Sequence, residues 1–228
     1  DYFFAEFGDI QHRAGRTLTA EDVKDAEALL VRSVTKVNAA LVQDSQIKFV
    51  GSATIGTDHL DIAALEQQNI RWSNAPGCNA QAVAEYVITA LLYLQPQLIN
   101  ANKEFTLGIV GLGNVGSRLA TMAKLLGWNV IAYDPFVQRD QVHQVKFEEL
   151  LKSADAISIH VPLTKTGQHP TYHLINANAL GQMKPEAILI NSARGSVVEE
   201  AALIADIQAT QRQVVLDVFE HEPEISEQ

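Results

Sequence analysis

Cysteine and basic residues are both scarce in this chain. The single cysteine, Cys78, cannot form a disulfide within the chain, so a reducing cytoplasm is the expected environment. The 17 lysines and arginines are outnumbered by 27 acidic residues, which leaves a formal net charge of −10. This balance argues against nucleic acid and anionic membranes as partners. An anionic substrate would need a locally basic pocket.

Long apolar runs are missing as well. The longest largely apolar stretch, Ala82–Leu94, has about 13 residues and is interrupted by Glu85, whereas a bilayer-spanning helix needs roughly 20. Residues 1–6 carry acid where a signal peptide would carry basic residues, and we find no internal repeat. The chain instead has 47% hydrophobic and 19% charged residues, which is typical of a soluble globular protein with a sizeable core.

The first part of the chain alternates between strand-like and helix-like segments. Apolar runs predict buried strands at Ala28–Val31 and Ile47–Val50, and Ile70–Trp72 is a weaker candidate. Thr19, followed three residues later by Asp22, is a capping signature that opens a helical segment. A long helix rich in Ala, Val and Leu is predicted from Asn79 to about Leu94.

From residue 105 onward the alternation becomes regular. The pattern predicts strands at Thr106–Val110, Asn129–Tyr133, Ala156–His160, Ala187–Ile190 and Gln213–Leu216. Helices are predicted between them, at Val115–Leu126, Phe147–Lys152, Asn176–Met183 and Glu199–Thr210. Such alternation indicates a doubly wound α/β domain with a parallel sheet of Rossmann type. We therefore expect two domains, 1–94 and 95–228. Because we count five strands where this fold has six, the second domain is expected to lack its last strand, and the sequence looks clipped at both ends.

A glycine-rich fingerprint follows the first of these strands, in the form Gly111-Leu112-Gly113-Asn114-Val115-Gly116. Gly111 would permit a tight turn, Gly113 would let the backbone approach a pyrophosphate, and Gly116 would let the helix pack on the strand. The helix then offers N–H groups and a partial positive charge to phosphates. The alternative is an incidental glycine turn in a βα unit, but the strand before it and the helix after it favour dinucleotide binding.

An acidic residue, Asp134, ends the second strand of the predicted Rossmann domain. A carboxylate here accepts hydrogen bonds from the adenosine ribose and repels a 2′-phosphate, so the sequence predicts NAD rather than NADP. Arg139 could favour NADP, although a solvated loop arginine is the simpler interpretation.

Three further motifs lie at the ends of predicted strands. They are His160-Val161-Pro162-Leu163, Asn191-Ser192-Ala193-Arg194-Gly195 and the run from Asp217 to Pro223. This set resembles the D-2-hydroxyacid dehydrogenase family over nearly the whole chain. The resemblance implies a flavodoxin-like α/β substrate domain beside the Rossmann domain. Segments 31–38, 51–59, 75–80 and the long segment 163–174 resemble a branch that oxidises 4-phospho-D-erythronate in pyridoxal 5′-phosphate synthesis.

The resemblance also implies roles for single residues. Arg194 would bind the substrate carboxylate and polarise the C2 oxygen, and Glu222 would hold and charge an acid–base imidazole. Asp217 would face the nicotinamide amide. Plainer alternatives are a surface arginine, an exposed acidic turn and a strand-end cap. The other cofactor positions implied are Ser192, Ala193, His160, Val161 and Pro162, with His160 taking no part in the chemistry.

In the first domain, Ser33 and Thr54 match substrate-contacting positions of the family. The backbone at Ile55 and Gly56 could cradle the substrate carboxylate. Arg32 and Lys36 are candidates for binding the phosphate, although either could be a solvated loop charge. No metal site is predicted.

The family's acid–base histidine has no counterpart in matching context among these 228 residues. We therefore expect the chain to be part of a longer enzyme and, alone, to bind NAD weakly and to turn over negligibly. The expected partner is a small phosphorylated hydroxy acid, and the enzyme is expected to be a homodimer. Two alternatives are an enzyme for another D-2-hydroxy acid, such as 3-phosphoglycerate, and a non-catalytic NAD-sensing protein similar to dehydrogenase-like corepressors.

Overall fold

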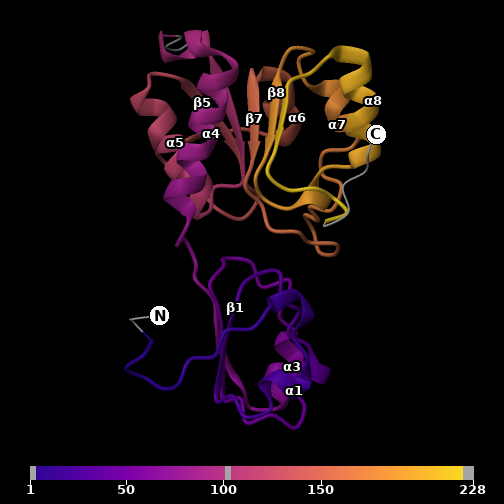
Figure 1. The fold of residues 1–228 in the computed structure, drawn as a ribbon. Coiled ribbons are helices and arrows are strands. Elements are labelled where there is room, and N and C mark those ends of the chain that lie inside the picture. The colour runs from indigo at the N-terminus through magenta and orange to yellow at the C-terminus, as the bar shows by residue number, and fades with distance from the viewer. Residues whose placement is uncertain (1–3, 101–103, 223–228) are drawn as a thin grey trace. The chain divides into compact units, whose positions relative to one another are not determined.

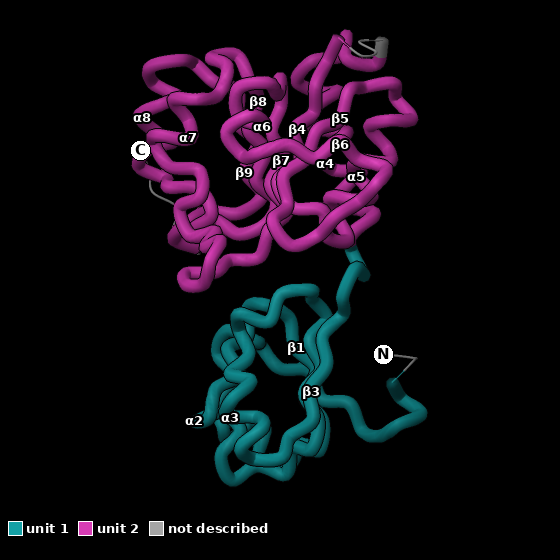
Figure 2. Tube along the Cα trace, turned by 180° about the vertical axis from the view of Figure 1, so that it is seen from behind, with its two compact units in different colours: residues 1–79 teal, residues 80–228 magenta. Residues whose placement is uncertain are grey.

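The structure is a computed structural model that describes residues 4–100 and 104–222, and it divides into two compact units (Figure 2). Unit 1 comprises residues 1–79 and unit 2 residues 80–228. The compact units divide between residues 79 and 80 and not at the expected domain boundary between residues 94 and 95, because helix α4 (Ala80–Leu94) packs with unit 2. The reason is hydrophobic, because the buried face of α4 shares one cluster with strand residues such as Leu107; that face consists of Ala84, Val87, Ile88 and Leu91.

Unit 1 is a small parallel α/β unit whose strand order is β1-β2-β3. In chain order its elements are η1 (Gly15–Thr17), α1 (Ala20–Val23), β1 (Ala28–Val31), α2 (Ala39–Val42), β2 (Phe49–Ser52), α3 (Ile62–Gln67) and β3 (Arg71–Ser73). All three predicted strands are present, displaced by at most two residues. The capping signature is confirmed, since the N–H and the hydroxyl of Thr19 both donate to the Asp22 carboxylate, at 2.9 and 2.6 Å.

The sheet of unit 1 is buried on one face. Leu29 and Val31 pack into the core of this unit together with Val50, whereas Leu30, which points to the other face, is 53% exposed. The prediction of a strand at Ala28–Val31 is therefore confirmed, but the prediction that this strand is buried is wrong for the face that carries Leu30. An apolar run of four residues does not reveal whether one or both faces of a sheet are covered.

Unit 2 contains the part of the chain in which strands and helices alternate regularly (Figure 1). After α4 its elements are η2 (Pro96–Asn100), β4 (Thr106–Val110), α5 (Asn114–Leu125), β5 (Asn129–Tyr133), β6 (His143–Gln144), α6 (Phe147–Ser153), β7 (Ala156–Ile159), α7 (Ala177–Gln182), β8 (Ile188–Asn191), η4 (Gly195–Val197), α8 (Glu200–Thr210) and β9 (Val214–Leu216). Every predicted helix and strand of this region is present within one residue.

The sheet of unit 2 has six parallel strands in the order β6-β5-β4-β7-β8-β9. This corrects the count of five, from which a missing strand was inferred. The overlooked strand is β6, whose two residues pair with Ile131 and Ala132 of β5. A strand of two residues is too short to show any hydrophobic periodicity, so the sequence could not reveal it.

Both faces of this sheet are covered, as the doubly wound prediction requires. Ile188 and Ile190 of β8 pack into a cluster with α4 and α5, while Leu189 between them packs with α6, α7 and α8. Adjacent strand residues point to opposite faces, so this alternation places a helical layer on each side. No helix among the described residues is long and apolar enough to cross a membrane.

Candidate dinucleotide and substrate site

The direction of winding reverses between β4 and β7, which are neighbours in the sheet of unit 2. From β4 the chain continues to β5 on one side, and from β7 to β8 on the other. Ligands of such sheets bind outside the carboxyl ends of the strands at this switch point. Gly111 and His160 are the first residues after these two strands. A Cβ on Gly111 would lie 2.5 Å from the His160 carbonyl oxygen, and its φ of +97° also favours glycine.

The other two fingerprint glycines differ in what surrounds them. A Cβ on Gly116 would lie 1.9 Å from the Gly111 carbonyl oxygen, so this glycine lets α5 pack against the turn. A Cβ on Gly113 would meet nothing within 4 Å, and Gly113 is the N-cap of α5. The first turn of a helix leaves its N–H groups without helical partners. The open space at Gly113 adjoins these N–H groups, which belong to Asn114, Val115 and Gly116, and a pyrophosphate requires such space at a helix N-terminus.

Asp134 lies directly beside this turn. Its carboxylate accepts a hydrogen bond from the Leu112 N–H at 2.7 Å, and from the N–H groups of Phe136 and Val137 at 2.9 Å each. These bonds fix the carboxylate at the carboxyl end of β5, next to the glycine turn. An ionised carboxylate has about four acceptor positions, so capacity remains for a ribose hydroxyl.

His160 has a structural role in this arrangement. Its Nε2 lies 2.8 Å from the hydroxyl of Ser158, which is fully buried. Desolvation lowers the pKa of His160 to about 4, so the imidazole is neutral at pH 7. A neutral ring held by a serine is consistent with the prediction that His160 takes no part in proton transfer, while Val161 and Pro162 continue the chain from it along the sheet edge.

The segment after β8 is shaped by Asn191, the first residue of its motif, to which the sequence assigned no role of its own. Asn191 is fully buried; its side-chain amide donates to the Arg194 carbonyl at 2.9 Å and its Oδ1 accepts from the Ala193 N–H at 3.1 Å. Its carbonyl accepts from the Asp217 N–H at 3.0 Å. The Asn191 side chain therefore fixes the backbone at Ala193 and Arg194, and the Asn191 backbone carbonyl links this segment to the end of β9. The one sign of this role in the sequence is an asparagine at the end of an apolar strand, directly before Ser192-Ala193-Arg194.

Gly195 brings the next loop against Arg194. A Cβ on Gly195 would lie 1.9 Å from the Phe219 carbonyl oxygen and 2.6 Å from the Glu220 nitrogen. Backbone of the loop after β9 therefore fills the space that a side chain at position 195 would occupy. In the loop after β9, Asp217 is exposed and Glu222 accepts a hydrogen bond from the Phe219 N–H at 2.8 Å. Arg194 and the loop carrying Glu222 are thus neighbours.

Ser192 provides a test of whether this edge fits a dinucleotide. Its hydroxyl oxygen is buried and has no hydrogen-bond partner in the structure. A buried polar group without a partner is costly, and such groups are rare in folded proteins. A ligand carboxamide beside Ser192 would satisfy the hydroxyl. Together with the open space at Gly113, this fits a nicotinamide dinucleotide along the carboxyl edge.

The predicted substrate residues all lie in unit 1, in the loops after β1 and β2. Arg32, Ser33 and Lys36 are exposed. Thr54 is half-buried, and its hydroxyl donates to the Gly56 carbonyl at 3.1 Å, while the Asn74 amide donates to the Ile55 carbonyl at 2.7 Å. The carbonyl groups of Ile55 and Gly56 are thus engaged within the protein, and the role expected of their N–H groups stays a prediction.

Two residues behind Thr54 were missed by the sequence analysis. The buried hydroxyl of Ser52 lies 2.8 Å from the Thr54 hydroxyl and 2.9 Å from Nε2 of His59. This chain of polar groups orients the Thr54 side chain. The sequence offers no sign of it, because the six residues between Ser52 and His59 form a loop whose path only the structure defines.

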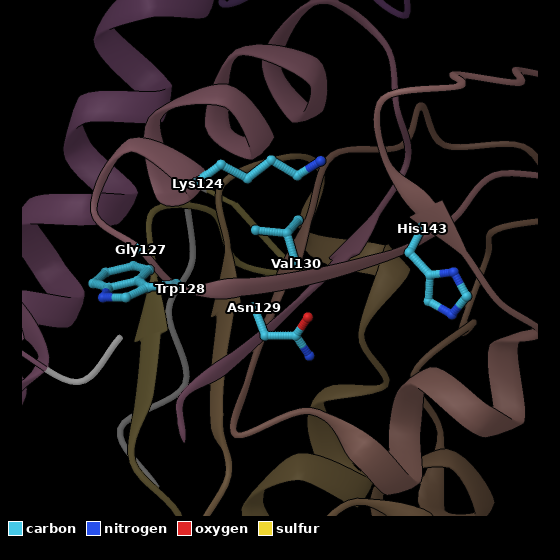
Figure 3. Close-up of a pocket in the computed structure, with 6 residues that line it drawn as sticks. All are labelled: Lys124, Gly127, Trp128, Asn129, Val130 and His143. Atoms are coloured by element: carbon cyan, nitrogen blue, oxygen red, sulfur yellow. The ribbon is translucent and has the colours of Figure 1, made fainter. Parts of the chain in front are cut away.

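A hollow of about 340 Å³ lies at the opposite edge of the sheet of unit 2, where β5 begins (Figure 3). It is lined by Lys124, Gly127, Trp128, Asn129, Val130 and His143. No predicted site residue lies there, and ligands of doubly wound sheets bind at the other edge. Among the described residues, no cluster of three or more His, Cys, Asp or Glu side chains could hold a metal ion.

Comparison with known proteins agrees with this geometry. Residues 93–228 match the family model of the D-isomer specific 2-hydroxyacid dehydrogenase, NAD binding domain. Erythronate-4-phosphate dehydrogenases from Acinetobacter baumannii (strain ATCC 17978) and Acinetobacter baylyi are 70% and 69% identical to the chain over all of its 228 residues. One from Psychrobacter cryohalolentis is 48% identical over 94% of the chain. The chain spans 61 to 64% of the length of these curated relatives.

Solved structures show the same fold. The NAD-bound 3-phosphoglycerate dehydrogenase of Entamoeba histolytica is 29% identical, with a TM-score of 0.79 over 93% of this chain and 70% of that one. The D-lactate dehydrogenase of Aquifex aeolicus, complexed with NAD and lactic acid, is 27% identical, with a TM-score of 0.76 over 92% of this chain and 73% of that one.

Proposed function

This chain belongs to the D-isomer specific 2-hydroxyacid dehydrogenase family, its residues 93–228 being the NAD-binding domain, and on that premise we propose a reaction. The protein oxidises 4-phospho-D-erythronate at C2 to 2-oxo-3-hydroxy-4-phosphobutanoate. The observation that carries the substrate is the 70% identity, over the whole chain, to proteins named erythronate-4-phosphate dehydrogenase. NAD, when bound along the carboxyl edge of unit 2, supplies the hydride acceptor.

Arg194 carries the recognition of the substrate in this proposal. A guanidinium is planar and always charged, so it can bind the carboxylate with two parallel hydrogen bonds and polarise the C2 oxygen as it becomes a carbonyl. Asn191 and the loop against Gly195 hold the Arg194 backbone from two sides. In a chain of net charge −10, this cation is the local positive charge that an anionic substrate needs.

Glu222 is proposed to hold the imidazole that takes the hydroxyl proton when hydride leaves C2. A carboxylate paired with an imidazole favours its charged form, which stabilises the proton after transfer. Asp217 is proposed to bind the nicotinamide amide, and Ser192 to donate to it with the hydroxyl that has no protein partner. In unit 1, Ser33 and Thr54 are proposed to contact the substrate, and Arg32 and Lys36 to bind its phosphate.

The proposed cellular location and oligomeric state follow from the same family membership. We propose that the protein works in the cytoplasm as a homodimer, since closed two-fold symmetry is the commonest arrangement of soluble enzymes. Sedimentation of the purified protein tests the dimer.

The experiment uses the protein in a form that extends to the length of its relatives. NADH formation is followed with 4-phosphoerythronate and 3-phosphoglycerate in parallel, for the parent and for Arg194→Ala. Losing a bidentate ion pair should lower kcat/KM for the four-carbon acid by roughly 10²- to 10⁴-fold, since each hydrogen bond to a charged group contributes about 1.5–3 kcal/mol. Arg139→Ala removes an exposed arginine of the same unit and is the matched control.

A parent enzyme that prefers 3-phosphoglycerate would replace the substrate but keep the reaction class, and the 29% identity to the Entamoeba enzyme makes that acid the competitor to include. A parent that binds NADH and oxidises neither acid contradicts the proposed function. Equal losses in Arg194→Ala and Arg139→Ala would remove the special role of Arg194.

A further inference from the structure

Three loops meet at the carboxyl edge of unit 2, beyond β7, β8 and β9. They are the long segment 163–174, the loop after β8 that contains Arg194, and the loop 217–222 that contains Glu222. The long segment is pinned at its base, because Thr171 N–H donates to the Thr164 carbonyl at 2.9 Å and Thr164 N–H donates to the Thr171 hydroxyl at 2.8 Å. Its end at His173 is therefore presented by an ordered loop.

His173 contacts both of the other loops. Its Nε2 lies 2.5 Å from Oε1 of Glu220, and its backbone N–H donates to the Ser196 carbonyl at 2.9 Å. The ring is stacked on Tyr172, with centroids 3.9 Å apart and planes 16° from parallel. The backbone of His173 is left-handed, with φ of +51°, a conformation that is uncommon for residues other than glycine but that asparagine, aspartate and histidine adopt more readily than most. Contacts within its own loop thus orient the His173 ring, independently of the contact with Glu220.

Glu220 is the point at which the loops join. Its second oxygen accepts a hydrogen bond from the Glu200 N–H, in the first turn of α8, at 3.0 Å. The Glu220 side chain is 10% exposed. Burial acts to raise the pKa of Glu220, but the hydrogen bonds from His173 and from the Glu200 N–H hold this pKa below its ordinary value. The carboxylate is therefore ionised at pH 7 and accepts from both partners.

The position of Glu222 depends on this anchor. Glu220 is two residues before it, the backbone at Phe219–Glu220 packs against Gly195, and Glu222 itself accepts from the Phe219 N–H. The side chain of Glu222 is exposed and makes no other hydrogen bond to any residue that the structure describes. Its placement is thus set by the turn, and the turn is set by Glu220.

We propose that His173 is a positioning residue, which through Glu220 fixes the loop 217–222 and so holds Glu222 beside Arg194. The inference rests on the proposed function in one respect, the role of Glu222 in proton transfer. The proposal also assigns a role to the long segment 163–174, because this segment supplies the histidine that fixes the position of the loop after β9. His173 and Glu220 are 47 residues apart in the sequence, and neither was assigned a role from it.

The test uses His173→Asn, because asparagine accepts a left-handed backbone but is too short to reach Glu220. His173→Gln, whose amide can reach farther, is the rescue variant, and His143→Asn, at an exposed histidine of the same unit, is the control. Hydrogen exchange of peptides covering residues 217–222 is measured on this chain. Kinetics and NADH affinity are measured on the form that extends to the length of the relatives.

In His173→Asn we expect exchange in 217–222 to rise at least fivefold while other peptides of unit 2 stay unchanged. We expect kcat to fall about 10- to 100-fold, the size of effect produced by a shift of about 1 Å in a catalytic group. NADH affinity should change less than threefold, His173→Gln should recover most of kcat, and adding Glu220→Gln should cost no more than Glu220→Gln alone.

Unchanged exchange and kcat in His173→Asn would overturn the proposal. So would a parallel loss of kcat, NADH affinity and thermal stability without rescue by His173→Gln, since that pattern belongs to a residue that only stabilises the fold. A parent protein inactive on every acid, with exchange still raised in His173→Asn, would contradict the function and support the link between His173 and the loop.

Discussion

Alanine at Gly113 and alanine at Gly116 should separate the cofactor role of the fingerprint from its role in folding. The two glycines are three residues apart at the start of α5, and both substitutions add one methyl group. At Gly113 that methyl group meets nothing within 4 Å, and the φ of −69° suits any residue. At Gly116 it would lie 1.9 Å from the Gly111 carbonyl oxygen and 3.1 Å from Cγ2 of Ile109.

The magnitudes follow from these surroundings. In Gly113→Ala, a poorer helix N-cap costs about 0.5–1 kcal/mol, and the stiffer unfolded chain returns about as much, so the free energy of unfolding should stay within about 0.5 kcal/mol. In Gly116→Ala, α5 must move away from the turn by more than an ångström. Overpacking of this kind costs about 1–3 kcal/mol, which exceeds the roughly 1 kcal/mol that alanine gains over glycine inside a helix.

NADH affinity should show the opposite order, with the larger loss in Gly113→Ala and the smaller loss in Gly116→Ala. The Gly113 methyl group occupies the space in front of the α5 N-terminus, so the pyrophosphate loses one or two charge-assisted hydrogen bonds. Such bonds contribute about 1.5–3 kcal/mol each, so losing one raises the Kd roughly 10- to 100-fold and losing two raises it roughly 10²- to 10⁴-fold.

Urea unfolding and NADH titration measure the two effects on the same proteins. Fluorescence of Trp128, which is buried in unit 2, reports unfolding of that unit if Trp72 of unit 1 is first replaced by Phe. The reasoning is refuted if Gly113→Ala unfolds as easily as Gly116→Ala, or if Gly113→Ala binds NADH as the parent does.

Four further predictions concern single side chains of unit 2. The pKa of His160 is about 4 in the folded chain and about 6.5 when unfolded, so its contribution to stability is fully present above pH 6.5 and is lost as pH falls towards 4. The upper limit of this contribution is about 3 kcal/mol, and the partial exposure of His160 reduces it. In His160→Gln, the free energy of unfolding in urea should therefore vary less with pH between 4.5 and 7.5 than it does in the parent. The guanidinium of Arg212, with 1% exposure, binds the carboxylate of Asp206 at 2.6 Å, so Arg212→Met should lower the free energy of unfolding by about 3–5 kcal/mol, and a loss below 1 kcal/mol would contradict this. Ser192→Ala removes a hydroxyl without a protein partner, so stability should hold while NADH affinity falls roughly 3- to 10-fold; a loss of stability instead would mean that the hydroxyl has a partner inside the protein. Asp134→Asn keeps an acceptor for the glycine turn but removes the charge that repels a 2′-phosphate, so the ratio of NADPH to NADH affinity should rise at least about tenfold in paired titrations, since 1.4 kcal/mol is enough for that change.

Local patterns were sufficient for most elements of unit 2. Strands β4 and β5 match their predicted residues fully, because apolar runs bounded by turns repeat there with a regular period. The fingerprint from Gly111 to Gly116 and the acid at Asp134 were also readable, since both are defined by spacing along one βα unit. The two-residue strand β6 was not, because it exists only by pairing with β5.

The sequence by itself was enough to determine the doubly wound class and to predict the place of the dinucleotide and the groups proposed to bind it. Those properties depend on neighbours within a few residues, where spacing and residue type are enough. The tertiary structure decided which groups meet: α4 with the second unit, Gly195 with the backbone of Phe219, and His173 with Glu220. These pairs are far apart in the chain, and only the folding of the sheet brings the loops at its edge into contact.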